Sequence, residues 1–173
     1  MAKIPFFDLT QASDQLKAML GTRPPLNIYK VVAHAGPVGE RFLGLGGALL
    51  RENALDSKLR ELVILRVGIL SAAAYEVHQH KRLASRIGVP DEKVAALEEG
   101  PEAAVFDDVE RAVLRFTDQV VRQVKADAAA FDEVAAHLSH RQLTELLVLI
   151  GYYMMVSRFL ENLEVEIEEP AGG

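Results

Sequence analysis

The sequence predicts an all-α protein, and three observations support this class. No segment alternates apolar and polar residues between turn pairs, as a half-buried strand would. Apolar residues recur instead at the three- and four-residue spacing of amphipathic helices, with Gly or Pro between the segments. One segment, residues 58–70, is apolar on nearly every face and predicts a central buried helix. With 173 residues, half of them apolar, the chain predicts a single domain of roughly seven or eight helices.

The first part of the chain predicts short helices separated by strong breakers. Three helices are expected before residue 52: Ser13–Leu20, Asn27–Ala35 and Val38–Arg51. Glycine and proline separate them, at Gly21, Pro24-Pro25 and Gly36-Pro37. Within the third helix, Gly44, Gly46 and Gly47 indicate close packing against a neighbour.

The central helix begins after a cap at Asp56 or Ser57 and continues to Leu70. Ser71 is the expected N-cap of the next helix, which ends at Gly88. The spacing of Ser139 and Gln142 predicts a capping box at the start of the last helix. The remaining helices are expected over residues 92–99, 107–125, 127–138 and 140–163.

The chain divides into three regions by composition and breakers. Residues 1–24 are a mixed N-terminal extension, and residues 25–163 form the helical domain. Residues 164–173 are an acidic tail that is expected to be loose.

Composition excludes several classes of function. The net charge is −6, the pI is near 5.4 and Lys and Arg form no run, so nucleic-acid binding is not expected. No basic start precedes an apolar signal region, and the longest apolar run, Leu143–Val156, is too short to cross a membrane. A cytoplasmic protein with no membrane partner is therefore expected. The chain has no cysteine, which excludes disulfides and thiol chemistry.

The densest group of chemically active side chains follows the central helix. Glu76 and His80 are four residues apart and share one face of a helix. His78 lies about 200° round from Glu76 and so points elsewhere. Glu61 lies within the apolar central helix. A carboxylate and an imidazole near the end of a buried helix are what acid–base catalysis requires.

Each candidate also has an ordinary structural interpretation. Glu61 lies near the start of its helix and could pair with Lys58 three residues earlier. The spacing of Glu76 and His80 is also that of a stabilising helix pair. Two histidines two residues apart point in different directions, unlike the zinc signature H-E-x-x-H, so no metal site is expected.

Several segments, taken together, resemble one protein family. RELVILRV, YEVHQHKRLA and GVPDEKVAAL are similar to the carboxymuconolactone decarboxylase family, whose wider superfamily includes the alkylhydroperoxidase AhpD. LTELLVLIGYYMMVSRFLENL resembles the closing helix of that family, and NIYKVVAHAGPVGERF fits its longer members. The resemblance covers about residues 25–163. It implies an AhpD-like helical fold and a homo-oligomer, a trimer or a hexamer built from trimers.

The resemblance also implies roles for individual residues. His80 matches the family histidine, and Glu61 matches its acidic partner. Glu76 stands where the decarboxylase branch has a glutamate. The peroxidase branch has two cysteines instead, at the positions of Ala73 and Glu76, so peroxide reduction by thiols is not expected here.

Three further residues are expected to bind the substrate. Tyr75 could donate a hydrogen bond or simply pack its ring, and both interpretations stay open. The resemblance places Tyr153 and Arg158 on a helix that contributes to the pocket walls.

The favoured hypothesis is an enzyme that needs neither cofactor nor metal and acts on a small organic acid, lactone or enol-forming carbonyl compound. His80 would be the general acid and base, and Glu61 or Glu76 would orient it. Decarboxylase, isomerase, hydrolase and other lyase activities would use the same residues. A carboxylate would raise the pKa of His80 and burial would lower it, so the direction stays open. The alternative is a non-catalytic helical oligomer that binds a small ligand or a partner. The two hypotheses differ in whether the three side chains meet in a pocket.

Overall fold

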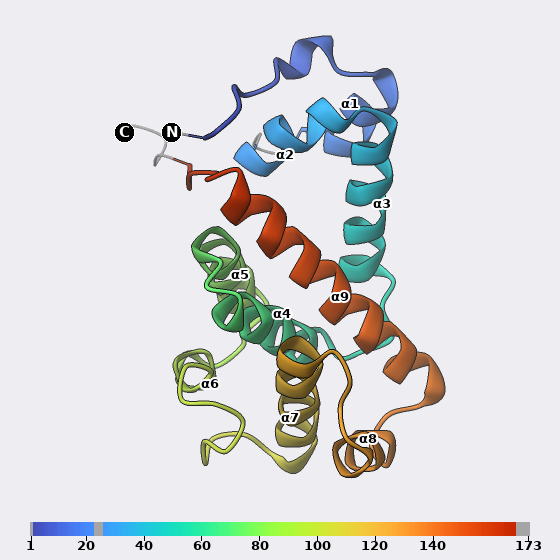
Figure 1. Cartoon of the computed structure of the whole chain (residues 1–173), viewed down its shortest axis with the longest axis vertical. Coiled ribbons are helices and arrows are strands. Elements are labelled where there is room, and N and C mark those ends of the chain that lie inside the picture. The colour runs from blue at the N-terminus through green and yellow to red at the C-terminus, as the bar shows by residue number, and fades with distance from the viewer. Residues whose placement is uncertain (1, 23–25, 169–173) are drawn as a thin grey trace.

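A computed structural model describes residues 2–22 and 26–168, which contain nine α-helices and no strand (Figure 1). The helices are α1 (Asp14–Leu20), α2 (Asn27–Val32), α3 (Pro37–Arg51), α4 (Ser57–Leu70), α5 (Ala74–Arg86), α6 (Asp91–Ala96), α7 (Asp108–Gln123), α8 (Ala128–Ala135) and α9 (His140–Asn162). Two short 3₁₀ helices, Leu9–Gln11 and Ala33–Ala35, complete them. The all-α class is confirmed. Each of the nine corresponds to a segment in which the sequence predicts a helix, so the described residues hold slightly more helices than the rough total of seven or eight.

Most predicted helix boundaries are confirmed within a few residues. The Asp56 carboxylate caps α4 by accepting from the backbone N–H groups of Lys58 and Leu59. Ser139 and Gln142 form the predicted capping box at the start of α9. Helices α6 and α8 end three residues earlier than predicted, after which the chain turns. The predicted break at Pro24-Pro25 lies outside the described residues.

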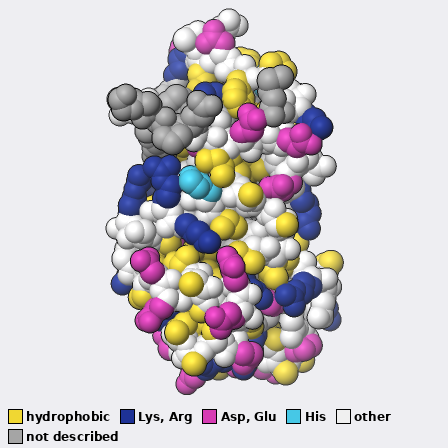
Figure 2. All heavy atoms as spheres, turned by 90° about the vertical axis from the view of Figure 1, so that its left-hand side faces the viewer, with side chains coloured by type: hydrophobic (Ala, Val, Ile, Leu, Met, Phe, Trp, Pro, Cys, Tyr) yellow, Lys and Arg dark blue, Asp and Glu magenta, His cyan; other side chains and the backbone are white. Residues whose placement is uncertain are grey.

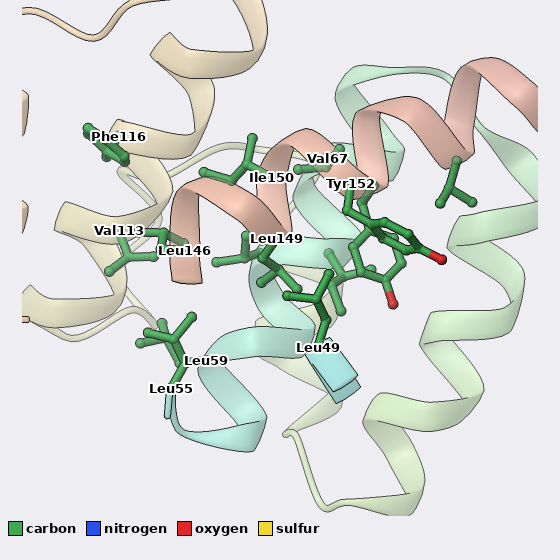
Figure 3. Close-up of a cluster of buried hydrophobic side chains, with 14 of the residues drawn as sticks. Leu49, Leu55, Leu59, Val67, Val113, Phe116, Leu146, Leu149, Ile150 and Tyr152 are labelled. Carbon is green, nitrogen blue, oxygen red and sulfur yellow. The ribbon is translucent and has the colours of Figure 1, made fainter. Parts of the chain in front are cut away.

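Helix α4 lies at the centre of the fold. It packs against α5, α7 and α9, and every residue from Leu59 to Gly68 is buried. Leu59 and Val67 contribute to the larger of the hydrophobic clusters, together with side chains of α7 and α9 (Figure 3). The opposite face of α4 carries Leu62 and Leu65 into a second cluster with α5, α6 and α7. Burial on all sides is the outcome that its apolar sequence predicts.

Helix α9 crosses the whole molecule and separates α1–α3 from α4–α8 (Figure 1). Where α3 meets it, the Tyr152 hydroxyl donates a hydrogen bond of 3.0 Å to the Phe42 carbonyl. Gly46 lies directly beside that hydroxyl, and a methyl group at this position would overlap it. The close packing predicted from the glycines of α3 is therefore present at Gly46.

The joint between α4 and α5 differs from the prediction. Ser71 is the C-cap of α4, and its hydroxyl makes no hydrogen bond to any described residue. Ala72 has a positive φ of 52°, which turns the chain so that α5 folds back against α4. The first N–H of α5, at Ala74, donates to the Glu161 carboxylate of α9 at 3.1 Å. The cap thus comes from a distant helix, because the turn at Ala72 carries Ser71 away from the start of α5.

The two ends of the described chain lie against each other. The Lys3 backbone N–H donates to the Leu163 carbonyl at 2.9 Å, and the Lys3 ammonium pairs with Glu164. Val165 is buried in the main hydrophobic cluster. Residues 164–168, the described part of the acidic tail, therefore follow the surface of the helical domain.

Within residues 2–22 and 26–168, one helix meets the length and composition of a membrane span. This is α9, which is longer than the apolar run within it, and half of its most apolar window is buried in the fold. Such burial is also typical of the core helix of a globular protein. On the face shown in Figure 2, acidic and basic side chains are interspersed among hydrophobic ones.

Candidate active site

His80 and Glu61 form a buried pair between α4 and α5. The Nδ1 atom of His80 lies 2.7 Å from Oε2 of Glu61. Glu61 is completely buried, and His80 is 8% exposed. A protonated Nδ1 donates to the carboxylate, which fixes the ring orientation and leaves Nε2 facing the other way. The lone glutamate of the central helix thus pairs with His80 of the next helix, rather than with Lys58.

Glu76 stands on the opposite side of the imidazole. Its Oε2 atom is 3.5 Å from Nε2 of His80, an ion-pair distance that is too long for a good hydrogen bond. Glu76 is only 5% exposed, yet its Oε2 atom accepts no hydrogen bond from any described residue. The pair therefore leaves one buried carboxylate oxygen ready to accept a proton or a hydrogen bond from a bound molecule.

Burial and charge together set the protonation of these groups. Burial lowers the pKa of His80, but the Glu61 hydrogen bond and the charges of Glu76 and Glu61 outweigh it and raise the pKa above its ordinary value. Burial raises the pKa of Glu76, and the attraction of His80 only partly offsets this. The direction left open by the sequence is thus an increase in the pKa of His80, which means that its surroundings stabilise the imidazolium form relative to a free histidine.

Two further side chains complete the surroundings of the pair. The Tyr153 ring meets the His80 ring edge to face, with centroids 5.0 Å apart. Burial raises the pKa of Tyr153 well above its ordinary value, so its hydroxyl stays protonated. Arg60, which sequence analysis did not single out, is buried with its Nε 3.5 Å from Oε1 of Glu61. Its charge balances the carboxylate that His80 contacts.

A cavity of about 910 Å³ opens beside Glu76 and His80. Helices α3, α5 and α9 form much of its wall, together with the segment around α2. Its aromatic lining consists of Tyr29, Phe42, Tyr75, Tyr152 and Tyr153, and its basic lining includes Arg51, Arg82 and Arg86. Glu61 is not in this lining and supports His80 from behind. The volume suits a small organic molecule rather than a macromolecular segment.

The structure brings together most of the residues predicted for the site. Glu76, His80, Tyr75 and Tyr153 line the cavity, and Glu61 contacts His80. His78 is half-buried and also lines it, at the wall rather than beside Glu76. Arg158 is exposed on α9, where it donates to the Met154 carbonyl, and it does not line the cavity.

Other contributors to the site were missed by sequence analysis. Gln79 and Glu168 line the cavity and are hydrogen-bonded to each other. Gln79 could have been found by its spacing, since it lies four residues after Tyr75. Glu168 carried no signal, because the acidic tail shows no periodicity. Among the residues described, no group of three or more His, Asp or Glu side chains has the arrangement of a metal site.

Part of the chain is similar to known proteins. Residues 36–119 match the model of the carboxymuconolactone decarboxylase family. A curated relative, YnjA of Escherichia coli (strain K12), is 28% identical over 117 residues, which make up 66% of this chain. The match spans 64% of YnjA, less than two thirds of its length.

Two solved structures share the fold over nearly the whole chain. The alkylhydroperoxidase AhpD core from Ralstonia eutropha JMP134 superposes with a TM-score of 0.86 at 15% identity, covering 97% of this chain and 93% of that one. The debrominase Bmp8 in complex with 2,3,4-tribromopyrrole has a TM-score of 0.78 at 19% identity, covering 97% and 94%. These likenesses show an AhpD-like helical fold. The matched segment is similar to the carboxymuconolactone decarboxylase family, although this chain contains no cysteine.

Proposed function

We propose that this protein is an acid–base enzyme that acts on a small organic acid, lactone or enol-forming carbonyl compound. One observation carries the proposal. Nδ1 of His80 is held by the buried Glu61 carboxylate, while Nε2 lies beside Glu76 at the wall of the cavity. This is the arrangement of a general acid and base whose orientation is fixed by a carboxylate behind it.

The proposed reaction is a proton transfer at a carbon next to a carbonyl group. In a decarboxylation, the bond between that carbon and the carboxylate breaks, and CO₂ leaves. The electron pair delocalises into the conjugated carbonyl and gives a dienolate. The Nε2–H of protonated His80 then donates its proton to the carbon, and the neutral imidazole regains a proton from solvent.

The two carboxylates have different roles in this proposal. Glu61 orients the ring and stabilises the imidazolium that the raised pKa of His80 favours. Glu76 has a raised pKa and an unpartnered oxygen, which suit it to exchange a proton or a hydrogen bond with the substrate oxygen. Tyr153 restricts the imidazole through its edge contact.

Known relatives support an enzymatic role in general terms. A structural neighbour is a debrominase, and the family is named for a decarboxylase. Peroxide reduction through thiols requires cysteine, and the chain contains none. The alternative is a non-catalytic helical oligomer that binds a small ligand. Glu76 and His80 line one cavity, and Glu61 contacts His80 from behind. This arrangement favours catalysis, since a binding pocket alone does not need a buried acid–base pair.

The proposal is tested with His80→Ala and Glu61→Gln, assayed separately against a panel of unsaturated lactone acids and β-keto acids. Release of CO₂ and deuterium incorporation from D₂O report decarboxylation and proton transfer. We expect turnover to fall by about 10²–10⁴-fold in His80→Ala, the usual contribution of general acid–base catalysis. His137→Ala replaces an exposed histidine and serves as the control. Full activity of a correctly folded His80→Ala variant would exclude the mechanism and leave the binding protein as the better interpretation.

A further inference from the structure

The described end of the chain closes over one side of the cavity. After α9, the Val165 N–H donates to the Leu160 carbonyl, and the Val165 side chain is buried. The next contact is between the Asn27 side-chain amide, which donates at 2.9 Å, and the Glu166 carbonyl. Glu168 then reaches the cavity and forms part of its lining. The tail is thus held by a series of specific contacts that ends at the Glu168 carboxylate.

Three donors converge on that carboxylate. The Tyr75 hydroxyl and the Asn27 backbone N–H each donate to Oε1 at 2.5 Å. The Gln79 amide donates to Oε2, also at 2.5 Å. Tyr75 is only 2% exposed, so its hydroxyl is a buried donor directed at this place. Both carboxylate oxygens are engaged, which is how a binding site recognises an organic acid.

The donors lie next to the proposed acid–base residues. Tyr75 and Gln79 are four residues apart on α5, and so are Glu76 and His80. The second pair is displaced from the first by one residue along the helix. The carboxylate of Glu168 therefore occupies a place in the same cavity, alongside the proposed reacting groups.

The charge of the cavity also favours an anionic occupant. Arg51, Arg82 and Arg86 line it, and none of them forms an ion pair with a described residue. Burial raises the pKa of Glu168, but hydrogen bonds from Tyr75, Asn27 and Gln79 outweigh it and hold the pKa below its ordinary value. The tail thus places an ionised carboxylate in a cavity whose basic side chains are otherwise unpaired in the described structure.

We propose that Tyr75, Gln79 and the Asn27 backbone form a carboxylate-binding subsite, and that Glu168 occupies it as an internal ligand that an acidic substrate must displace. The inference rests on the proposed function, because it assigns the acid group of the substrate to a place in the same cavity. The C-terminal segment is then autoinhibitory. A tethered carboxylate acts at a high effective concentration, so it lowers the apparent affinity for a free one.

The test measures binding of benzoate and of benzamide, its neutral isostere, to the full-length chain by calorimetry. In Glu168→Gln, which removes the competing charge, we expect benzoate affinity to rise about tenfold. Benzamide affinity should change less than about twofold, because the subsite selects for charge. Glu164→Gln is the matched control, since this carboxylate pairs with Lys3 outside the cavity. Adding Tyr75→Phe to Glu168→Gln should remove the gain.

Several outcomes would overturn the inference. Benzoate binding that is equal in the wild type and Glu168→Gln, or absent from both, would show that the donors form no carboxylate subsite. An equal gain in benzamide affinity would show that the tail only blocks the cavity sterically and does not compete through its charge. If both Glu168→Gln and Glu168→Ala unfold, Glu168 is needed for the stability of the fold and is not a displaceable internal ligand. In a His80→Ala background the benzoate gain should persist, so a failure of the proposed catalysis is distinguished from a failure of this subsite.

Discussion

The imidazole of His80 lies between two carboxylates in different surroundings. Glu61 is wholly buried, accepts from Nδ1 and has Arg60 beside it. Glu76 faces the cavity at a longer distance and has a raised pKa. One carboxylate therefore fixes the ring, and the other is left to interact with a bound molecule.

The raised pKa of His80 has a consequence for stability. The folded protein binds this proton more tightly than the unfolded chain, so the contribution to stability is fully present below about pH 6.5, the ordinary histidine value. It is lost as pH rises through the folded pKa, with a slope of at most about 1.4 kcal/mol per pH unit. Glu76, whose pKa is also raised, acts in the same direction from a lower pH.

We therefore expect the free energy of unfolding to decrease between neutral and mildly alkaline pH in the wild type, and to decrease less in His80→Gln. Urea unfolding at a series of pH values measures both slopes. His137→Gln, at an exposed histidine, should follow the wild type. Identical slopes in the wild type and His80→Gln would show that His80 titrates alike in the folded and unfolded chains.

Individual site residues differ in how far the sequence could reveal them. Glu76 and His80 were predictable because a spacing of four fixes their proximity on any helix. Glu61 had to be placed by resemblance, since its approach to His80 depends on how α5 folds back on α4. Arg60 and Glu168 could not be found, because their partners are set by tertiary contacts that no local pattern encodes.

At the scale of the element, α4 determines the positions of the others. Its sides are covered by α5, α7 and α9, and it contributes Leu59 and Val67 to one cluster and Leu62 and Leu65 to another. Its position was predictable because apolar residues on every face leave a helix no exposed side.

Truncation of this core should be costly. Leu62→Ala and Leu65→Ala each remove a completely buried side chain, so we expect each to lower the free energy of unfolding by about 2–5 kcal/mol. Val38→Ala, at a largely exposed position on α3, should cost far less. Denaturant unfolding measures all three, and losses below about 1 kcal/mol at both α4 positions would place the core elsewhere.

The contact between α3 and α9 allows a matched glycine comparison. A methyl group at Gly46 would overlap the Tyr152 hydroxyl, whereas one at Gly44 would meet Met19 at an ordinary 3.8 Å. We expect Gly46→Ala to lower the free energy of unfolding by about 1–3 kcal/mol through overpacking. Gly44→Ala should be neutral or stabilising by up to about 1 kcal/mol, because alanine favours helix. Thermal unfolding distinguishes the two, and equal effects would argue against the close approach.

Helix starts show where local patterns fail. Asp56 and Ser139 cap their own helices, and both were predictable because the capping side chain is adjacent in sequence. Ser71 was chosen for the same reason, but α5 begins three residues later and takes its cap from Glu161. A cap supplied by another helix carries no sequence signature.

At the scale of the whole molecule, α9 exposes an apolar stripe. Leu147, Val148 and Met155 are each more than 40% exposed, and they recur at helical spacing on the side away from the core. Exposed apolar side chains aligned on one face are typical of a protein–protein contact. We propose that this stripe is a subunit contact in a homo-oligomer, the trimer or hexamer that the family resemblance implies.

We expect light scattering to give the mass of a homo-oligomer at micromolar concentration. Leu147→Glu should dissociate it, because the charge would be buried in the contact. Val124→Glu is the control, since Val124 is 90% exposed and lies outside α9. A monomeric wild type, or an oligomer that withstands Leu147→Glu, would argue against this use of the stripe.

Because Glu161 of α9 caps the start of α5, this contact can form only after α9 has been synthesised. Glu61, Glu76 and His80 leave the ribosome long before Tyr153 and Glu161, the residues of α9 that contact His80 and the start of α5. A domain generally folds as a unit, once its chain has been released. A nascent chain that lacks α9 therefore carries the reactive side chains without their final arrangement. The proposed acid–base residues therefore reach the arrangement described here only after α9 has been released.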